Sequence, residues 1–417
     1  MFLLIYNIVI LAYGAGIRLA SLWNPKALCW IRGRKDQFRN VELALKNNTR
    51  PVIWMHSASL GEFEQGRFLL ENIRIKYPDK CIVITFFSPS GYEVMKDYKG
   101  ADHIFYLPLP TKRNAKKFID ALRPQLVLWI KYDYWYHYLA ELKKNHTPLL
   151  LVSAIFHRRQ PFFRWYGTIY KKMLRCFSWL FVQNDESAKR LASIGFSDNV
   201  SVNGDTRFDR VIDIAENFTG IPQIEAYCGS AQVVVAGSTW PEDEEELDHY
   251  ANTHPEIKFI IAPHEIHEDH LKSIEKLFHH SVRYSQINSS GTRNKNTLII
   301  DNMGMLSKLY YYATIAYVGG GFGSEGVHNV LEAAVFKKPL LFGPVFNKFR
   351  EAIGLLEEGA AFTVNNAIEL ENVLNNLLSD ENLFEECAVA AGKYVYGHKG
   401  ATHNILNYIH ANRLLIS

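Results

Sequence analysis

The first residue with candidate chemistry is an acid that follows a small-residue turn. In "WMHSASLGEFEQG" (54–66), an apolar run gives way to two serines, Gly61 and Glu62, and then to a helical pattern. A carboxylate there is either an ordinary first-turn acid that complements the helix dipole or a general base directed into a cleft. The segment has no GxSxG pattern, so we do not expect a nucleophilic serine.

Two further segments of the first half end a strand-like run with polar residues. Ser88 and Ser90 follow one run in "SPSGYE", and Lys131 and Asp133 follow another in "WIKYDYWYHYL". Because the carboxyl ends of parallel strands point the same way, we expect these side chains to lie near Glu62. The alternative is a set of ordinary capped turns.

The second half contains a turn that suits a phosphate. In "VVVAGSTWPEDEEEL", an apolar run is followed by Gly237, Ser238 and Thr239 and then by a helix start with Pro241. Free backbone N–H groups and hydroxyls at a helix start can bind a phosphate, although a capped helix without a ligand has the same pattern. Gly304 lies at a similar turn in "DNMGMLSKLY", where its backbone could approach a phosphate or a base.

A glycine-rich turn precedes two polar residues in "GGGFGSEGVHNVLEAA". Gly321, Gly323 and Gly326 spell GxGxxG, but the acid expected about twenty residues later is missing, so we reject a dinucleotide site. Asn329 and Glu332 are three residues apart and should share one helix face. Glu332 is either an acceptor for both hydroxyls of a ribose or a solvated first-turn acid.

Composition and spacing argue against several other kinds of site. His264, His267 and His270 drift around a helix face without a fourth ligand, so we expect a polar loop that lines the cleft and no metal. The five cysteines are scattered without a CxxC pair, which favours a reducing compartment. The formal net charge of +3 is too small to indicate binding to nucleic acid.

Apolar runs that alternate with amphipathic stretches must position these side chains. Runs such as "KCIVITFFS" and "PLLLVSAIF" read as buried strands, and a second series begins with "AQVVVAGST". This alternation predicts parallel sheets covered on both faces. With 417 residues, we predict an α/β protein of two Rossmann-like doubly wound domains facing a central cleft. The predicted boundaries are 1–24 for an N-terminal helix, 25–205 for the first domain, 206–228 for a linker, 229–385 for the second domain and 386–417 for C-terminal helices that pack back toward the first.

The N-terminal segment "MFLLIYNIVILAYGAGIRLASLW" is almost wholly apolar, with Arg18 as its only charge. It is just long enough to cross a bilayer as a helix. Basic residues follow it rather than precede it, which argues against a signal peptide and would hold the remaining chain in the cytoplasm. We predict a membrane anchor, spanning or monotopic, with a buried core helix as the alternative.

Four motifs in order, "HSASLGE", "AGSTWPEDEE", "DNMGMLSKLY" and "GVHNVLEAA", resemble the 3-deoxy-D-manno-octulosonate (Kdo) transferases of lipopolysaccharide assembly. The resemblance covers nearly the whole chain. It implies a GT-B fold (glycosyltransferase family 30) and inverting transfer of Kdo from CMP-Kdo to a lipid A precursor, lipid IVA. It also implies a place on the cytoplasmic side of the inner membrane, with the membrane surface as a partner. A metal, another cofactor, nucleic acid and an obligate protein partner are not expected.

The resemblance further implies roles for the candidate residues. Glu62 is expected to be the general base that removes the proton of an acceptor hydroxyl. The residues expected near the acceptor and Kdo are Ser59, Gly61, Ser88, Ser90, Lys131 and Asp133. The residues expected to bind CMP are Gly237, Ser238, Thr239, His264, Gly304, Met305, Gly326, Asn329 and Glu332.

The chain also departs from the family pattern. Lys131 and Asp133 occupy positions where two glutamates are expected, and Trp240 replaces a histidine. Met305 replaces the glutamate of a Gly-Glu-Leu run, and "APHEIHEDH" replaces a Pro-Arg-His run. Lys131 could take the place of a lost cation near the Kdo carboxylate.

Two other functions fit parts of this pattern. One is another GT-B enzyme that uses a UDP-sugar, either a transferase or a 2-epimerase. The other is a membrane-tethered scaffold whose site has decayed. A comparison of CMP with UDP tests the first, and the effect of changing Glu62 tests the second.

Overall fold

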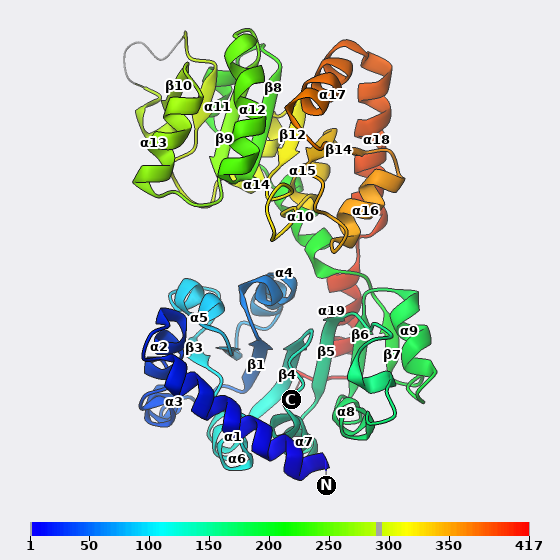
Figure 1. Ribbon diagram of the computed structural model, residues 1–417. Helices are drawn as coiled ribbons and strands as arrows, with labels where there is room; N and C mark the ends of the chain where they lie inside the picture. The colour runs from blue at the N-terminus through cyan, green and yellow to red at the C-terminus, as the bar shows by residue number, and fades with distance from the viewer. Residues whose placement is uncertain (1, 289–293, 417) are drawn as a thin grey trace. The chain divides into compact units, whose positions relative to one another are not determined.

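The computed structural model describes residues 2–288 and 294–416. The chain divides into two compact units (Figure 1). The first comprises Met1–Asp209 and Gly400–Ser417, and the second comprises Arg210–Lys399. Each unit is a parallel β-sheet covered by helices, which confirms the predicted α/β class.

The sheet of the first unit has the strand order β3-β2-β1-β4-β5-β6-β7, and its pairings are parallel. The chain runs from β1 out to β3 and then returns to the other side of β1 with β4. The carboxyl ends of β1 and β4 therefore form a topological switch point, where ligands of open α/β sheets bind. The strands are β1 (Val52–Ser57), β2 (Cys81–Phe86), β3 (His103–Tyr106), β4 (Pro124–Ile130), β5 (Leu149–Ala154), β6 (Trp179–Val182) and β7 (Val200–Val202).

The two faces of this sheet have separate hydrophobic cores, because alternate strand residues point in opposite directions. Trp54 and Trp129 enter one core, whereas Met55 and Leu128 enter the other together with Phe63. The helices of the first unit are α1 (Phe2–Ala20), α2 (Pro25–Arg32), α3 (Gln37–Leu45), α4 (Leu60–Lys76), α5 (Pro89–Met95), α6 (Lys112–Leu122), α7 (Tyr136–Lys144), η1 (Pro161–Phe163), α8 (Thr168–Leu174), α9 (Asp185–Ala192) and α19 (Ala401–Ala411).

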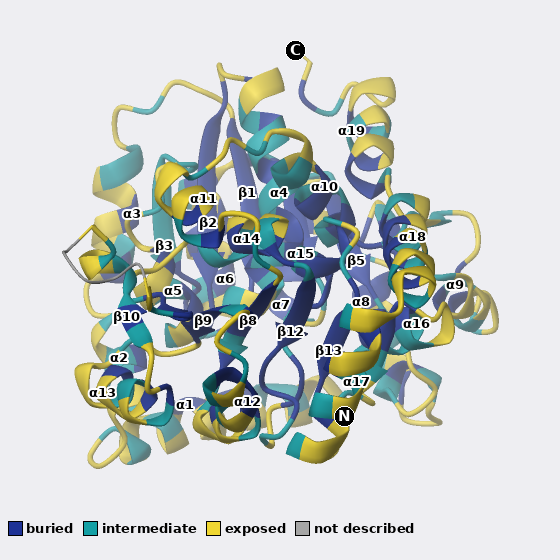
Figure 2. Cartoon of the chain, turned by 90° about the horizontal axis from the view of Figure 1, so that it is seen from above, coloured by how far each residue is buried: buried dark blue, intermediate teal, exposed yellow. Residues whose placement is uncertain are grey.

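The second unit repeats the plan with the strand order β10-β11-β9-β8-β12-β13-β14. Figure 2 shows the buried strands in dark blue and the exposed outer faces of the helices in yellow. The strands are β8 (Val233–Thr239), β9 (Lys258–Pro263), β10 (Ser281–Arg283), β11 (Thr297–Ile299), β12 (Ile315–Val318), β13 (Leu340–Phe342) and β14 (Ala361–Thr363). The helices are α11 (Pro222–Cys228), α12 (Pro241–Thr253), α13 (Glu268–Leu277), η2 (Tyr284–Gln286), α14 (Leu306–Leu309), η4 (Tyr310–Tyr312), α15 (Leu331–Ala334), α16 (Arg350–Glu357), α17 (Ala367–Ser379) and α18 (Glu381–Gly397).

The segment 206–228, which the sequence suggests as a linker, contains two helices. These are α10 (Thr206–Glu216) and α11, and the division between the units falls inside α10. The carboxylate of Asp209 accepts the backbone N–H groups of Gly400 at 2.5 Å and of Thr402 at 2.6 Å. This carboxylate ties the start of α19 to the first unit.

Helix α1 is, within the described residues, the one helix long and apolar enough to cross a membrane. Its contacts with the domain include the Tyr6 hydroxyl, which accepts the Tyr136 N–H at 3.1 Å, and Asn7 Oδ1, 2.6 Å from His137 Nε2. Only 11% of its most apolar 18-residue stretch is buried, so the alternative of a buried core helix is wrong. Its exposed apolar side chains include Leu3, Leu4, Ile5, Ile8, Val9, Leu11 and Leu19.

A glycine sets how closely α4 approaches the first sheet. A Cβ atom on Gly66 would lie 2.7 Å from Ile130 Cδ1 and 2.9 Å from Met55 Sδ. Both neighbours are buried side chains of the strands beneath, so α4 packs on β4 and β1 through its own backbone. This close packing fixes the first turn of α4, which contains Glu62.

The substitution Gly66→Ala should destabilise the protein. Overpacking costs about 1–3 kcal/mol, which exceeds the gain of about 0.5–1 kcal/mol from placing alanine in a helix. The matched control is Gly397→Ala in α18, where a Cβ would have nothing within 4 Å. Thermal unfolding should show a lower melting temperature for Gly66→Ala alone, and equal melting temperatures for the two variants would contradict this packing.

Candidate active site

The turn between β1 and α4 forms a hydrogen bond with the side chain of Glu62, the acid that follows it. Ser59 precedes the helix in extended backbone, and Glu62 lies in the first turn. Glu62 Oε2 accepts the N–H of Ala58 at 2.6 Å. Glu62 is therefore a helix-start acid in its local structure, as one of the two sequence interpretations expects.

The surroundings of Glu62 also change its acidity. Burial raises the pKa of Glu62 to about 7, and the negative charge of Asp133 adds to the rise. The Ala58 N–H and the positive charge of Lys131 oppose it. A carboxylate with a pKa near neutrality can take up and release a proton at physiological pH, which is the property a general base needs.

A buried hydrogen-bond network holds Asp133 in place. Asp133 Oδ2 accepts the indole N–H of Trp135 at 3.1 Å and lies 3.2 Å from His56 Nε2. His56 is fully buried, and its Nδ1 lies 2.9 Å from Thr85 Oγ1, which accepts the indole N–H of Trp54 at 2.8 Å. With Thr85 as the donor to Nδ1, a neutral His56 carries its hydrogen on Nε2 and donates it to Asp133.

Lys131 lies at the carboxyl end of β4, with a φ of +57°. A non-glycine residue in this left-handed region costs about 1–3 kcal/mol and is common at functional sites. Although burial raises the pKa of Asp205, its pair with Arg207 and the charge of Lys131 hold that pKa below its ordinary value. Lys131 is thus within electrostatic reach of both Glu62 and Asp205.

A third turn lies at the carboxyl edge of the first sheet, beside those after β1 and β4, and it follows β2. The backbone N–H of Ser88 donates to the carbonyl of Ala58 at 2.8 Å, so this turn lies against the turn after β1. The Ser88 hydroxyl accepts the Ser90 N–H at 3.3 Å and caps α5. Gly61 leaves open space, because a Cβ there would have nothing within 4 Å.

The sequence interpretation missed several members of this site. His56 and Thr85 lie inside strands β1 and β2, and Asp205 and Arg207 lie beyond the last strand of the sheet. The first pair could have been suspected, because they are polar residues at the ends of runs that are otherwise apolar. The second pair carries no comparable local signal.

In the second unit, the turn after β8 is largely occupied by its own hydrogen bonds. Ser238 has a φ of +54°. Thr239 is buried, and its hydroxyl donates to Glu244 Oε1 at 2.8 Å. A Cβ on Gly319 would lie 2.4 Å from the Ser238 carbonyl, so the turns after β8 and β12 are in close contact.

Three rings from three turns of the second sheet stack beside one another. The ring centroids of Trp240 and His264 are 4.8 Å apart, and those of His264 and His328 are 4.4 Å apart. The indole N–H of Trp240 donates to His328 Nε2 at 3.0 Å. Burial, together with His264, lowers the pKa of His328 to about 4, so His328 is neutral at physiological pH.

Asn329 and Glu332 lie together as expected, although Asn329 precedes the helix rather than lying on it. Asn329 Nδ2 donates to Glu332 Oε1 at 2.9 Å, while its buried Oδ1 has no hydrogen-bond partner within the described residues. Burial raises the pKa of Glu332, and the charge of Arg210 opposes the rise. Glu332 is therefore not a solvated first-turn acid.

The remaining predicted nucleotide residues are turn formers. Gly304 and Gly326 have φ values of +90° and +88°, which glycine adopts most readily. Met305 precedes α14. A Cβ on Gly326 would lie 2.6 Å from Phe349 Cε2, so its backbone passes close to that ring.

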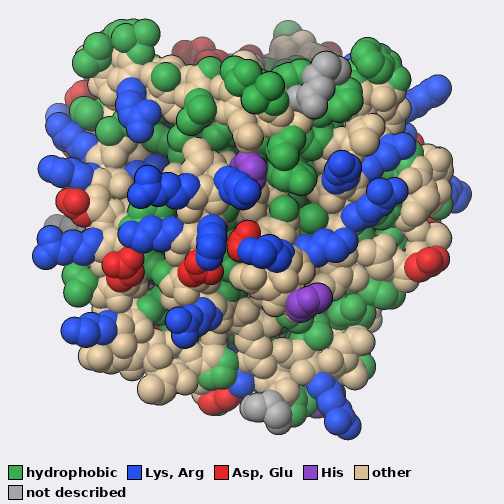
Figure 3. Space-filling view, turned by 90° about the horizontal axis from the view of Figure 1, so that it is seen from below, with side chains coloured by type: hydrophobic (Ala, Val, Ile, Leu, Met, Phe, Trp, Pro, Cys, Tyr) green, Lys and Arg blue, Asp and Glu red, His purple; other side chains and the backbone are tan. Residues whose placement is uncertain are grey.

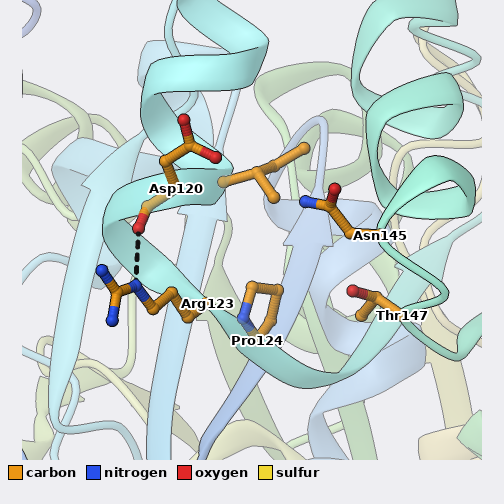
Figure 4. Close-up of a pocket in the computed structure, with 6 residues that line it drawn as sticks. Asp120, Arg123, Pro124, Asn145 and Thr147 are labelled. Atoms are coloured by element: carbon orange, nitrogen blue, oxygen red, sulfur yellow. Dashed lines mark hydrogen bonds between the residues drawn. The ribbon is translucent and has the colours of Figure 1, made fainter.

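A cavity of about 480 Å³ lies at the opposite edge of the first sheet, where β4 begins (Figure 4). It contains none of the predicted site residues. Its lining consists of Ile119, Asp120, Arg123, Pro124, Asn145 and Thr147. Within residues 2–288 and 294–416, no group of three or more His, Cys, Asp or Glu side chains could hold a metal ion.

The two parallel sheets define the class of protein. The chain resembles the solved UDP-GlcNAc 2-epimerase of Neisseria meningitidis with a TM-score of 0.60 at 16% identity, over 86% of this chain and 100% of that one. This likeness confirms the predicted GT-B fold.

Sequence comparison relates the chain to one family of transferases. A family model described as 3-deoxy-D-manno-octulosonic-acid transferase (kdotransferase) matches residues 33–210. The 3-deoxy-D-manno-octulosonic acid transferase of Rickettsia prowazekii is 29% identical over 364 residues, which cover 83% of this chain and 77% of that protein. The enzyme of the same name from Chlamydia trachomatis serovar A is 29% identical over 347 residues, covering 80% of this chain and 79% of that protein. The chain is a relative of the Kdo transferases, and the resemblance seen in the sequence is confirmed.

Changing Glu62 to Gln should alter how stability depends on pH. The folded protein keeps a proton on Glu62 up to about pH 7, whereas an ordinary glutamate releases it near 4.5. The raised pKa therefore favours the folded state below pH about 4.5, and this contribution is lost as the pH rises through about 7, a loss of about 3 kcal/mol. Glutamine avoids this loss and can still accept the Ala58 N–H. Glu62→Gln should melt above wild type at about pH 8 and close to it at about pH 5, and a difference independent of pH would contradict the raised pKa.

Proposed function

We propose that the protein transfers Kdo from CMP-Kdo to the sugar of a lipid A precursor with inversion, and that Glu62 is the general base. The observation that carries this proposal is the half-buried carboxylate of Glu62, whose pKa of about 7 suits proton transfer at the switch point of the first sheet. The relationship to Kdo transferases supports the identity of the transferred sugar.

In the proposed reaction, Glu62 accepts the proton of an acceptor hydroxyl. The oxygen of that hydroxyl attacks the anomeric carbon of Kdo at the same time. A new C–O bond forms as the bond between that carbon and the CMP phosphate breaks, and CMP leaves with the bonding electrons. Asp133, held by His56 and Trp135, keeps a negative charge near Glu62 and thereby keeps its pKa high. This charge makes Glu62 a stronger base.

The donor is proposed to bind in the second unit. The acceptor oxygens of Glu332 and the unsatisfied Oδ1 of Asn329 suit the two hydroxyls of a ribose. The backbone of Gly237 and Ser238 and the start of α12 suit the phosphate. The charge of the departing CMP would then be stabilised by backbone donors and a helix dipole.

The acceptor is proposed to be lipid IVA, reached from the cytoplasmic side of the inner membrane. The exposed apolar face of α1 supports attachment to a membrane. Attachment would hold the first unit where a lipid-linked sugar is available.

The direct test is to incubate the purified protein with CMP-Kdo and lipid IVA and to follow the lipid by mass spectrometry. A mass increase of one or more Kdo residues is expected. Parallel binding measurements with CMP and UDP separate this proposal from an enzyme that uses a UDP-sugar. Tighter binding of UDP, together with an unchanged lipid mass, would contradict the proposal.

Changing Glu62 should remove transfer without removing donor binding. Loss of a general base lowers the rate by about 10²–10⁴-fold, so Glu62→Gln should lose transfer while its affinity for CMP stays within about twofold of wild type. For wild type, kcat/KM should rise with pH up to about 7, because the base must be ionised. Full activity of Glu62→Gln would instead favour a scaffold or a different base.

The proposed role of Lys131 near the Kdo carboxylate can be tested with CMP as the reference ligand. Lys131→Met keeps most of the length of the side chain but removes its charge, so affinity for CMP-Kdo should fall by about tenfold. Affinity for CMP, which lacks that carboxylate, should not change. An unchanged affinity for CMP-Kdo would remove Lys131 from the donor site.

A further inference from the structure

A second cavity in the first unit lies between the C-terminal part of α1 and the end of α2. It has a volume of about 390 Å³, and its lining includes four cations: Arg18, Arg32, Arg34 and Lys35. Among the described residues that line it, none is Asp or Glu. Asp36 follows Lys35 in the chain but is exposed and does not belong to the lining. The cavity therefore has a positive charge that its own walls do not balance.

Arg34 is the most enclosed of these cations. Its Nε, Nη1 and Nη2 donate to the backbone carbonyls of Leu107 at 2.9 Å, Trp30 at 3.1 Å and Phe87 at 2.7 Å. Its guanidinium carbon lies 3.7 Å from the centre of the Trp30 ring. In the described part of the chain, no carboxylate forms an ion pair with Arg34, Arg18, Arg32 or Lys35. Carbonyls and rings hold the Arg34 guanidinium in place but do not neutralise it.

A buried donor without an acceptor belongs to Trp30, a residue that lines the same cavity. Trp30 is 7% exposed, and its indole N–H has no hydrogen-bond partner within the described residues. Leaving a buried N–H unsatisfied is costly, and such groups commonly mark the place of a missing ligand or water. An anionic oxygen in this cavity could accept that hydrogen bond and balance the cations at once.

The position of α1 indicates where the anion comes from. Gly14 and Arg18 of α1 line the cavity, and Ile10 and Gly14 are buried against the domain. The Tyr6 and Asn7 hydrogen bonds hold the N-terminal part of the helix on the domain, so its exposed apolar side would enter a membrane while the helix stays on the domain surface. Figure 3 shows a face with hydrophobic side chains along its upper edge and many Lys and Arg side chains across its middle. Cations next to an interfacial helix lie at the depth of lipid headgroups.

We propose that this cavity binds the phosphate of an anionic membrane lipid, with Arg18, Arg32 and Lys35 as its cations and the Trp30 N–H as a further donor. Arg34 forms the charged floor of the site. The lipid phosphate fixes the depth at which the first unit lies on the membrane. The apolar face of α1 attaches the protein to a membrane whatever the headgroup of its lipids.

The test compares binding of the full-length protein to two kinds of vesicle, phosphatidylcholine alone and phosphatidylcholine with phosphatidic acid. The variant Arg32→Ala/Lys35→Ala changes two exposed side chains of the cavity, so its fold should be retained. Its partition into phosphatidic acid vesicles should fall by about tenfold or more, while its partition into phosphatidylcholine should not change. Trp30→Phe keeps an aromatic ring and removes the donor, and should weaken the phosphatidic acid preference by about threefold to tenfold.

The matched control is Arg39→Ala/Lys46→Ala, which removes the same charges from exposed positions on α3 and directly after it, outside this lining. This control should retain most of the preference for phosphatidic acid. Equal losses in the two double variants would mean general attraction to a charged surface and would overturn the site. Calorimetry with inorganic phosphate distinguishes the other source: phosphate binding that Arg32→Ala/Lys35→Ala abolishes, together with unchanged vesicle binding, would also overturn the lipid proposal. None of these readouts depends on Kdo transfer, so failure here and failure of the proposed reaction are separate results.

Discussion

The constraint on which the first unit depends is the burial of one carboxylate at the start of a helix. Glu62 accepts backbone N–H groups of Ala58 and Ser59 and lies near the charge of Asp133. The close packing of α4 on the sheet through Gly66 holds this carboxylate at the switch point. The network from Trp54 through Thr85 and His56 to Asp133 then keeps a second charge beside it. Burial and the charge of Asp133 favour the protonated form of Glu62, whereas the backbone N–H groups and the charge of Lys131 favour the ionised form, and the resulting pKa is about 7.

The second unit uses the same helix-start arrangement for a different purpose. Asp243 occupies the corresponding third position of α12, but its carboxylate accepts three hydrogen bonds, from the Trp240 N–H at 2.9 Å, the Gly320 N–H at 2.8 Å and the Tyr317 hydroxyl at 2.7 Å. An acid with this many donors is fully engaged in holding two turns together. Glu62 accepts backbone hydrogen bonds from Ala58 and Ser59, one fewer than Asp243 accepts in all.

The sequence was most informative about periodic features. Continuous apolar runs such as "KCIVITFFS" predicted parallel strands because both faces of such a sheet are covered, and the strand ends then brought Ser88, Lys131 and Glu62 to one edge. Contacts between distant segments could not be predicted in this way. The pair of Asp205 with Arg207, the ring stack of Trp240 with His264 and His328, and the orphan N–H of Trp30 depend on packing that no local pattern encodes. Asn329 shows the limit of periodicity, since it contacts Glu332 from a turn and not from the helix face that the spacing suggested.

The central claim is that Glu62 titrates near neutrality in the folded protein, and the most direct measurement is its own titration. Carbon-13 NMR or infrared difference spectra of wild type against Glu62→Gln would report the carboxylate as a function of pH. The account predicts a midpoint at about pH 7, which falls when Asp133→Asn removes the neighbouring charge. A midpoint close to 4.5, the ordinary value for glutamate, would contradict it.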